Sequence, residues 1–227
     1  MNFESINAKH PWGVNIGVDV DETMFPNLPI FIEWHNVHYG SEAVLNDFAS
    51  YGGWNDVFNV SVATIVERYM DFMFGYYRGL NPDPFPGVED ALGLLKVDGA
   101  RINAVSSRQS ELAVITQHQI LSKFADQRLV MGYSFGNKYS RDKKNLSFKE
   151  KWESCELMRV RLMIEDRVSD AESLAEHGIR VILFNNGLAY PWSVSDHEHD
   201  LIHVVSDWKE VYPLANKLVH EAYQEVL

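Results

Sequence analysis

The stretch NIGVDVDETMF, from Asn15 to Phe25, decides the fold because it joins an apolar segment to a group of acids. Residues 15–20 are apolar at nearly every position, which is typical of a parallel strand buried on both faces. Its later part carries acidic and hydroxyl side chains: Asp19, Asp21, Glu22 and Thr23. Because ligands of parallel sheets bind at the carboxyl ends of the strands, we expect these side chains to lie at a binding edge.

The two aspartates of this stretch are candidate metal ligands. Asp19 and Asp21 are two residues apart, so an extended backbone directs both side chains to the same side. Two close carboxylates repel each other, and a bound cation relieves the repulsion. Oxygen ligands in a small site suit magnesium. A solvated acidic turn explains the stretch equally well when it is taken alone, and Glu22 is interpreted as a turn residue.

The remainder of the chain predicts an α/β fold with an insertion. Residues 26–79 are rich in aromatic residues and mostly helical in period, and 62–73 fit a helix with a wide apolar face. Three prolines in LNPDPFPG then predict a linker. Strands are predicted after it at 100–106, 128–132, 161–165, 180–184 and 201–205, with helices between them. This alternation predicts a Rossmann-like parallel sheet with helices on both faces. We expect a core of residues 1–25 and 80–227 and a small helical cap of residues 26–79.

A second strand also ends in acids. The stretch RLMIEDRVSDAESLAEHGIRVILF contains a strand, an acidic turn, a helix and another strand, and Glu165 and Asp166 lie at the first strand's carboxyl end. Because a parallel sheet brings both acidic strand ends to one edge, a shared metal site becomes the favoured interpretation. For Asp170, capping of the next helix and a role beside the metal stay equally open.

Two further stretches offer groups that suit a phosphate. Ser106 and Ser107 end a predicted strand just before a helix, where a hydroxyl and free N–H groups suit a phosphate oxygen. An ordinary helix cap by Ser107 or Ser110 is the favoured interpretation of that stretch alone. Lys149 and Lys151 lie in the first turns of a predicted helix, where the dipole disfavours cations unless an anion faces them. For at least one of these lysines, a solvated side chain is favoured.

These stretches, in this order, resemble the motifs of the haloacid dehalogenase-like (HAD) superfamily of phosphatases. DVDET resembles its DxDxT motif, AVSS its strand ending in Ser or Thr, and IEDRVSD its acidic pair on a strand. Lys151 stands 14 residues before Glu165, as the motif lysine does, with Lys149 in reserve. The narrower likeness is to the cytosolic-type 5′(3′)-deoxyribonucleotidases, through GVDVDETMF, FPGVEDAL, SSR and IEDR followed by VILFNN. Phe25 and the prolines after it depart from the commoner form of that family.

The resemblance implies a magnesium-dependent phosphomonoesterase that works through an aspartyl-phosphate. Asp19 is then the nucleophile, and Asp21 protonates the leaving oxygen and later activates water. Magnesium is held by Asp19, the backbone carbonyl of Asp21, Asp166 and, through water, Glu165. The phosphoryl group is held by Ser106 and Lys151, with Thr23 and Ser107 as further candidates.

The resemblance leaves three hypotheses for the function, and the favoured one is a 5′-nucleotidase acting on (deoxy)nucleoside monophosphates. The second is a phosphatase for a sugar phosphate or another small metabolite, and the third is a nucleotide-binding protein without turnover. An aromatic of the insertion could stack on a base, but most are expected to form the insertion's own core. His35 and His38 lack an apparent third ligand, so a second metal site is rejected.

Composition limits the partners. The 227 residues are 46% hydrophobic, and the net charge of −12 argues against binding a nucleic-acid polymer while leaving a small anionic substrate open. Cys155 is the only cysteine, so no intrachain disulfide is expected. The N-terminus does not resemble a signal peptide, and no apolar run approaches the ~20 residues of a membrane span. We expect a cytoplasmic protein without a membrane partner, and a homodimer stays open.

Overall fold

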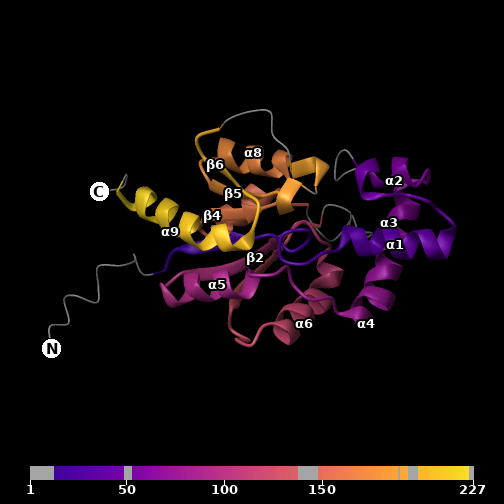
Figure 1. The fold of residues 1–227 in the computed structure, drawn as a ribbon, viewed down its shortest axis with the longest axis horizontal. Coiled ribbons are helices and arrows are strands. Elements are labelled where there is room, and N and C mark those ends of the chain that lie inside the picture. The colour runs from indigo at the N-terminus through magenta and orange to yellow at the C-terminus, as the bar shows by residue number, and fades with distance from the viewer. Residues whose placement is uncertain (1–12, 49–52, 138–147, 189, 194–198, 225–227) are drawn as a thin grey trace.

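The computed structural model describes residues 13–48, 53–137, 148–188, 190–193 and 199–224 (Figure 1). The N-terminal stretch, on which the expected absence of a signal peptide rests, lies outside the described residues. Among the helices of the described ranges, none is both long and apolar enough to cross a membrane.

Six parallel strands form one sheet in the order β3-β2-β1-β4-β5-β6. The strands are β1 Asn15–Val18, β2 Arg101–Ser106, β3 Val130–Phe135, β4 Val160–Glu165, β5 Arg180–Phe184 and β6 Ile202–Val205. The chain runs outward from β1 to β2 and β3 on one side, and later to β4, β5 and β6 on the other. The strand order therefore reverses at β1, and open α/β sheets bind ligands in the crevice at such a reversal.

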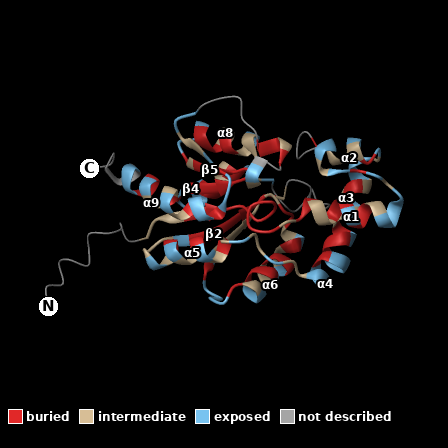
Figure 2. Ribbon diagram, viewed as in Figure 1, coloured by how far each residue is buried: buried red, intermediate tan, exposed pale blue. Residues whose placement is uncertain are grey.

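Helices cover both faces of the sheet, which confirms the expected α/β architecture. The covering helices are α5 Val88–Val97 and α9 Trp208–Gln224 on one face, and α7 Lys151–Leu157 and α8 Val168–Glu176 on the other. Side chains alternate between the faces along each strand, so Ile16 and Val18 pack toward α5 and α9, whereas Met163 and Val181 pack toward α7 and α8. Figure 2 shows buried residues concentrated along the strands and the inner sides of the helices.

Two strands differ from the prediction by more than one residue at an end. The first strand ends at Val18 instead of Val20, because the carbonyl of Val20 accepts the N–H groups of Met24 and Phe25 at 3.1 and 3.0 Å in a tight turn. Strand β3 begins and ends later than predicted, at Val130–Phe135. Most of its side chains are only half-buried at the sheet edge, so its sequence lacks the continuous apolar run that marks a central strand.

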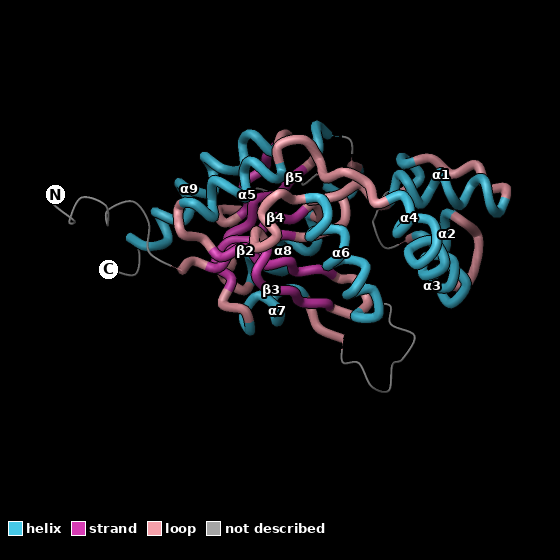
Figure 3. The backbone as a smooth tube through the Cα atoms, turned by 90° about the horizontal axis from the view of Figure 1, so that it is seen from below, coloured by secondary structure: helices cyan, strands magenta, loops and turns pink. Residues whose placement is uncertain are grey.

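The segment between β1 and α5 forms a group of helices at one end of the sheet (Figures 1 and 3). Its helices are α1 Leu28–Tyr39, α2 Trp54–Val57, α3 Val62–Asp71 and α4 Arg78–Leu80. The predicted helix over 62–73 ends earlier, because the chain passes into a π-helical turn at Phe72–Tyr77. The exact division into core and cap stays a prediction.

Aromatic side chains fill the interior of this helical group, as expected. Phe31 lies at the centre, with ring centroids 5.1 Å from Trp54 and 5.2 Å from Phe72. The same apolar cluster includes side chains that follow core strands: Leu112, Ile115, Tyr190 and Trp192. Trp192 lies in the 3-10 turn Pro191–Ser193 and contacts Asp166 at the carboxyl edge of the sheet. The helical group is therefore packed directly on the elements around that edge.

Candidate active site

A tight turn after β1 places the first two acids. The N–H of Asp19 donates to the carbonyl of Ile164 at 2.9 Å, which extends the pairing with β4 beyond the strand proper. The N–H of Glu22 then donates to the carbonyl of Phe25 at 2.9 Å, and Glu22 has a left-handed backbone with φ of 58°. This reversal holds Asp19 and Asp21 at the carboxyl edge of the sheet.

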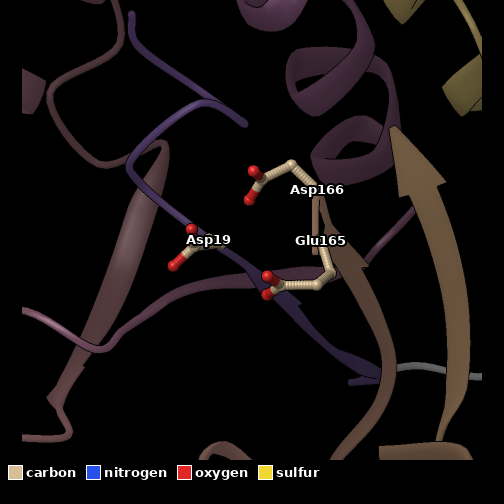
Figure 4. A group of neighbouring side chains, drawn as sticks. All are labelled: Asp19, Glu165 and Asp166. Atoms are coloured by element: carbon tan, nitrogen blue, oxygen red, sulfur yellow. The ribbon is translucent and has the colours of Figure 1, made fainter. Parts of the chain in front are cut away.

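Three buried acids converge at this edge. Asp19 follows β1, while Glu165 ends β4 and Asp166 follows it. One carboxylate oxygen of each lies within 4.8 Å of the others (Figure 4). The two acidic strand ends of the sequence therefore meet, as the parallel topology predicted. Carboxylate oxygens are the ligands that magnesium prefers, so this donor set fits that ion.

Lys151 is the lysine that lies among these acids. Its Nζ is 3.0 Å from Asp19 Oδ1, 2.5 Å from Glu165 Oε2 and 3.3 Å from Asp170 Oδ2. Burial lowers the pKa of Lys151, but attraction to these carboxylates outweighs burial and holds the pKa well above its usual value. The reserve candidate, Lys149, is half-buried, and its N–H donates to the carbonyl of Gly136 at 3.0 Å. The geometry thus favours Lys151.

The acids together carry more negative charge than Lys151 balances. Burial raises the pKa of Asp19 to about 6, against the opposing attraction of Lys151. Burial also holds the pKa values of Glu165 and Asp166 well above their usual range, and repulsion from Asp19 adds to both shifts. A divalent cation beside the three acids would lower these pKa values. The electrostatics of the cluster therefore also fit a metal site.

Asp21 points to a different partner. Arg108 Nε lies 2.9 Å from Asp21 Oδ2 and Arg108 Nη2 lies 2.5 Å from Oδ1, which is a bidentate ion pair. Arg108 is buried, and its Nη1 donates to Thr116 Oγ1 at 2.8 Å. The Asp21 carboxylate does not belong to the three-acid group. The metal contact implied for Asp21 uses its backbone carbonyl, and that contact stays a prediction.

The remaining predicted phosphate contacts lie nearby. Ser106 ends β2 and is buried, and its Oγ accepts the N–H of Arg108 at 3.1 Å. Ser107 lines a cavity between the helical group and the core. The hydroxyl of Thr23 donates to Asp166 Oδ1 at 3.3 Å, so it contacts the acid cluster. Contacts of these hydroxyls with a phosphate stay predictions.

One of the two capping alternatives from the sequence does not hold. Neither serine after β2 caps a helix, since a 3-10 turn over Ser110–Leu112 precedes α6 Ala113–Lys123 and neither element has a side-chain cap. Asp170 lies in the first turn of α8, so capping by its carboxylate stays open. Its Oδ2 lies 3.3 Å from Lys151 Nζ and 3.4 Å from Arg167 Nη1. Asp170 therefore sits beside the cluster through Lys151.

A cavity of about 140 Å³ lies next to Asp21. From the core it is lined by Asp21, Ser107, Arg108, Gln109 and Arg167. From the helical group it is lined by Trp54, Asn55, Val62, Ile65, Val66 and Tyr69. One wall is thus mainly apolar and the other is polar and charged, so the cavity can hold the organic part of a small amphiphilic ligand.

Sequence reasoning missed two residues of this region. Arg108 is the arginine of SSR, and nothing in its spacing indicates Asp21, from which it is separated by 87 positions. Trp192 donates its indole N–H to Asp166 Oδ2, and no pattern in its loop signals that contact. Both contacts join segments that are distant in sequence, and only the folded chain brings them together.

No protein-family model and no curated protein matches the sequence. Solved structures match its fold. A predicted phosphatase from Clostridium acetobutylicum is 15% identical with a TM-score of 0.65, over 91% of this chain and 100% of that one. A haloacid dehalogenase-like hydrolase from Streptococcus pneumoniae is 14% identical with a TM-score of 0.65, over 89% and 98%. A putative β-phosphoglucomutase from Thermotoga maritima is 13% identical with a TM-score of 0.59, over 90% and 99%. These likenesses show the predicted HAD-type fold, and none of the three proteins is described as a nucleotidase.

Proposed function

We propose that the chain is a magnesium-dependent phosphomonoesterase acting on a small phosphorylated metabolite. The convergence of Asp19, Glu165 and Asp166 with Lys151 carries this proposal, because it combines a carboxylate nucleophile, a cation site and a fixed positive charge. The position of the cluster at the strand-order reversal supports it, since ligands bind there in open α/β sheets. The HAD-type phosphatases that share the fold support it further.

The chemistry assigned to these residues proceeds in two steps. A carboxylate oxygen of Asp19 attacks phosphorus and forms an aspartyl-phosphate, while the leaving oxygen takes a proton from Asp21. Water then attacks the aspartyl-phosphate and gives a proton back to Asp21, which releases phosphate and restores Asp19. Dividing one displacement into two lowers the barrier of each. Asp19, Glu165 and Asp166 would hold magnesium, which would supply positive charge beside the transferring phosphoryl group.

Lys151 forms an ion pair with Asp19, and Arg108 forms one with Asp21. Lys151, 3.0 Å from Asp19, balances charge where an anionic nucleophile approaches an anionic phosphate. Arg108 fixes the carboxylate of Asp21 at the cavity, where the leaving group would lie. Both ion pairs, Lys151 with Asp19 and Arg108 with Asp21, are buried. Burial excludes water and so strengthens the electrostatic attraction within each pair.

A sugar phosphate or a metabolite of similar size is the preferred substrate class. The cavity of about 140 Å³ holds about one six-membered ring, since a cavity of similar volume holds benzene. The β-phosphoglucomutase among the solved structures that share the fold points the same way. A nucleoside monophosphate is the second candidate, because the rings of Trp54 and Tyr69 on the cavity wall suit a planar base.

Phosphate release across a substrate panel tests this function. The panel contains sugar phosphates, short phosphorylated acids and nucleoside monophosphates, each with magnesium and with EDTA. We expect release only with magnesium, highest for the first two classes, and loss of release in Asp19→Asn. No release from any ester would refute the proposal, and saturable nucleotide binding without release would favour the non-catalytic alternative.

Tyr69→Leu and Trp54→Leu distinguish the two substrate classes. If the substrate is a nucleoside monophosphate, removing a ring that stacks on its base raises KM for nucleotides by about tenfold, since a stacked base is worth ~1–3 kcal/mol. If the substrate is a sugar phosphate, these changes affect all substrates alike. Val62→Ala, on the same cavity wall, is the matched control because it removes contact area without removing a ring.

A further inference from the structure

The carboxylate of Asp166 is held by donors on both of its oxygens. The indole N–H of Trp192 donates to Asp166 Oδ2, and the hydroxyl of Thr23 donates to Oδ1 at 3.3 Å. The hydroxyl of Ser193 also donates to the backbone carbonyl of Asp166. All of these side chains are buried, and Asp166 is only 1% exposed. The orientation of this carboxylate is therefore set by the protein and not by water.

From this arrangement we infer that Trp192 is a positioning residue that orients Asp166 for a divalent cation. The inference rests on the proposed function, because it assumes that the three-acid cluster binds the cation. A carboxylate has about four lone-pair sites, so one hydrogen bond on each oxygen leaves sites for a metal. The indole N–H is a donor without an acceptor site, so it cannot compete for the ion.

The same loop anchors Trp192 firmly. Its ring stacks on Tyr190, with centroids 4.8 Å apart and planes 14° from parallel. Both rings belong to the apolar cluster that contains Phe31 of α1. The indole therefore cannot turn away from Asp166 without disturbing the packing between the helical group and the core. Such outer partners of metal ligands typically change metal affinity 10–100-fold when they are removed.

Trp192→Phe removes the N–H donor and keeps an aromatic ring in the stack. Tyr190→Phe is the matched control, because it removes a buried hydroxyl from the same stack, and that hydroxyl is bonded to Asn186 instead of an acid. Titration calorimetry of Mg²⁺ into each EDTA-treated, dialysed full-length protein measures the affinity without substrate. We expect affinity to fall at least tenfold in Trp192→Phe and to stay within twofold of wild type in Tyr190→Phe.

Activity provides a second readout. Raising Mg²⁺ to saturation should restore most of the kcat of Trp192→Phe without changing its KM for the phosphate ester. Equal Mg²⁺ affinity in Trp192→Phe and wild type overturns the inference. A wild type that binds no Mg²⁺ overturns both the inference and the proposed metal dependence. Mg²⁺ binding that depends on Trp192, without phosphate release, supports the inference and overturns the proposed activity.

If Trp192→Phe does not fold, a measurement on the wild type still tests the inference. In the ¹⁵N-labelled protein, the indole N–H peak of Trp192 is assigned through its contacts with Tyr190. Mg²⁺ should shift this peak more than the indole peaks of the other tryptophans, because its acceptor oxygen belongs to a metal ligand. An unshifted Trp192 peak at saturating Mg²⁺ overturns the inference.

Discussion

Arg108 binds Asp21 through two parallel hydrogen bonds, of 2.9 Å from Nε and 2.5 Å from Nη2, and both side chains border the cavity. The aspartates on either side of Val20 thus have different cations, since Asp19 lies beside Lys151. A fork-shaped guanidinium fixes the direction of a carboxylate in a way that a point charge does not. The two aspartates therefore have separate ionic partners, and the different roles assigned to them belong to the proposed mechanism.

Arg108→Gln should leave a buried Asp21 without its cation. Removing one partner of a buried ion pair destabilises a protein by about 3 kcal/mol, so we expect a lower midpoint of urea unfolding. The double variant Arg108→Gln/Asp21→Asn should lose less stability than the two single variants combined, because no unpaired charge remains. Additive losses across this cycle would show that the pair is not coupled. Arg108→Lys, which keeps charge without the fork, should fold better than Arg108→Gln and still lose about tenfold in kcat.

The acid cluster predicts opposite effects of two inactivating substitutions. Asp19→Asn removes one of the repelling carboxylates, so the EDTA-treated variant should unfold at a higher temperature than the wild type. Lys151→Met removes the cation that lies 2.5 Å from Glu165, so it should unfold at a lower temperature. Scanning calorimetry with and without Mg²⁺ measures both. Mg²⁺ should raise the unfolding temperature of Lys151→Met and have less effect on Asp19→Asn. If the unfolding temperatures of both variants changed in the same direction relative to the wild type, the excess of negative charge in the cluster would be contradicted.

The acid cluster was predictable because it depends on local pattern and on topology. Apolar runs identified β1 and β4, and parallel strands necessarily bring their carboxyl ends to one edge. The sequence therefore predicts four acids at one edge: Asp19, Asp21, Glu165 and Asp166. In the structure, the Asp21 carboxylate instead pairs with Arg108, and the other three acids converge. The choice between Lys149 and Lys151 needed the structure, because both fit the start of a helix and only one reaches the acids.

Side-chain partners distant in sequence were not predictable. Glu22 was interpreted as a turn residue, and its left-handed backbone agrees with that role. Its buried carboxylate also accepts the N–H groups of Asn27 and Leu28, at 2.7 and 2.5 Å, at the start of α1. The positive end of a helix dipole favours such a carboxylate. Hydrophobic periodicity does not indicate which turn residue will be buried, so the contact between the turn after β1 and the helical group could not be predicted from the sequence.

His35 should make the stability of the protein depend on pH. It is buried in α1, its Nδ1 lies 2.7 Å from Ser41 Oγ, and its Nε2 accepts from Arg68 Nη1 at 3.0 Å. Burial, with the nearby Arg68 charge, lowers its pKa from 6.5 to about 4. Between these values the unfolded chain binds a proton that the folded protein does not, so stability falls as pH falls. The contribution lost between pH 7.5 and 5 is about 2 kcal/mol.

Urea unfolding at pH 7.5 and pH 5 isolates this contribution. Between pH 7.5 and pH 5, the free energy of unfolding of His35→Gln should fall by about 2 kcal/mol less than that of the wild type. His38→Gln is the matched control, because His38 is an exposed residue of the same helix, with its ring stacked on Trp34. It should keep the wild-type pH dependence. Identical pH dependence in His35→Gln and wild type would mean that the buried imidazole does not carry the effect.

We expect a side chain at position 136 to slow the reaction, although Gly136 itself has no reactive group. Its N–H donates to the carbonyl of Ser106 at 2.8 Å, and its carbonyl accepts the N–H of Lys149 at 3.0 Å. A Cβ at this position would meet the Lys149 carbonyl at 3.0 Å and the Ser107 Cα at 3.4 Å. Because these contacts are backbone atoms, Gly136→Ala must shift one of the two segments that carry the phosphate-site candidates. We expect kcat to fall about tenfold with Mg²⁺ affinity unchanged.

Gly93→Ala supplies the comparison for that substitution. Gly93 lies within α5, and a Cβ there meets nothing within 4 Å. Alanine in a helix interior is favoured over glycine by up to about 1 kcal/mol, so this variant should be slightly more stable and equally active. Steady-state kinetics and urea unfolding of both variants separate a general effect of an added methyl group from displacement at the site. If Gly136→Ala kept wild-type kcat, the spacing between the serine and lysine segments would not limit the reaction.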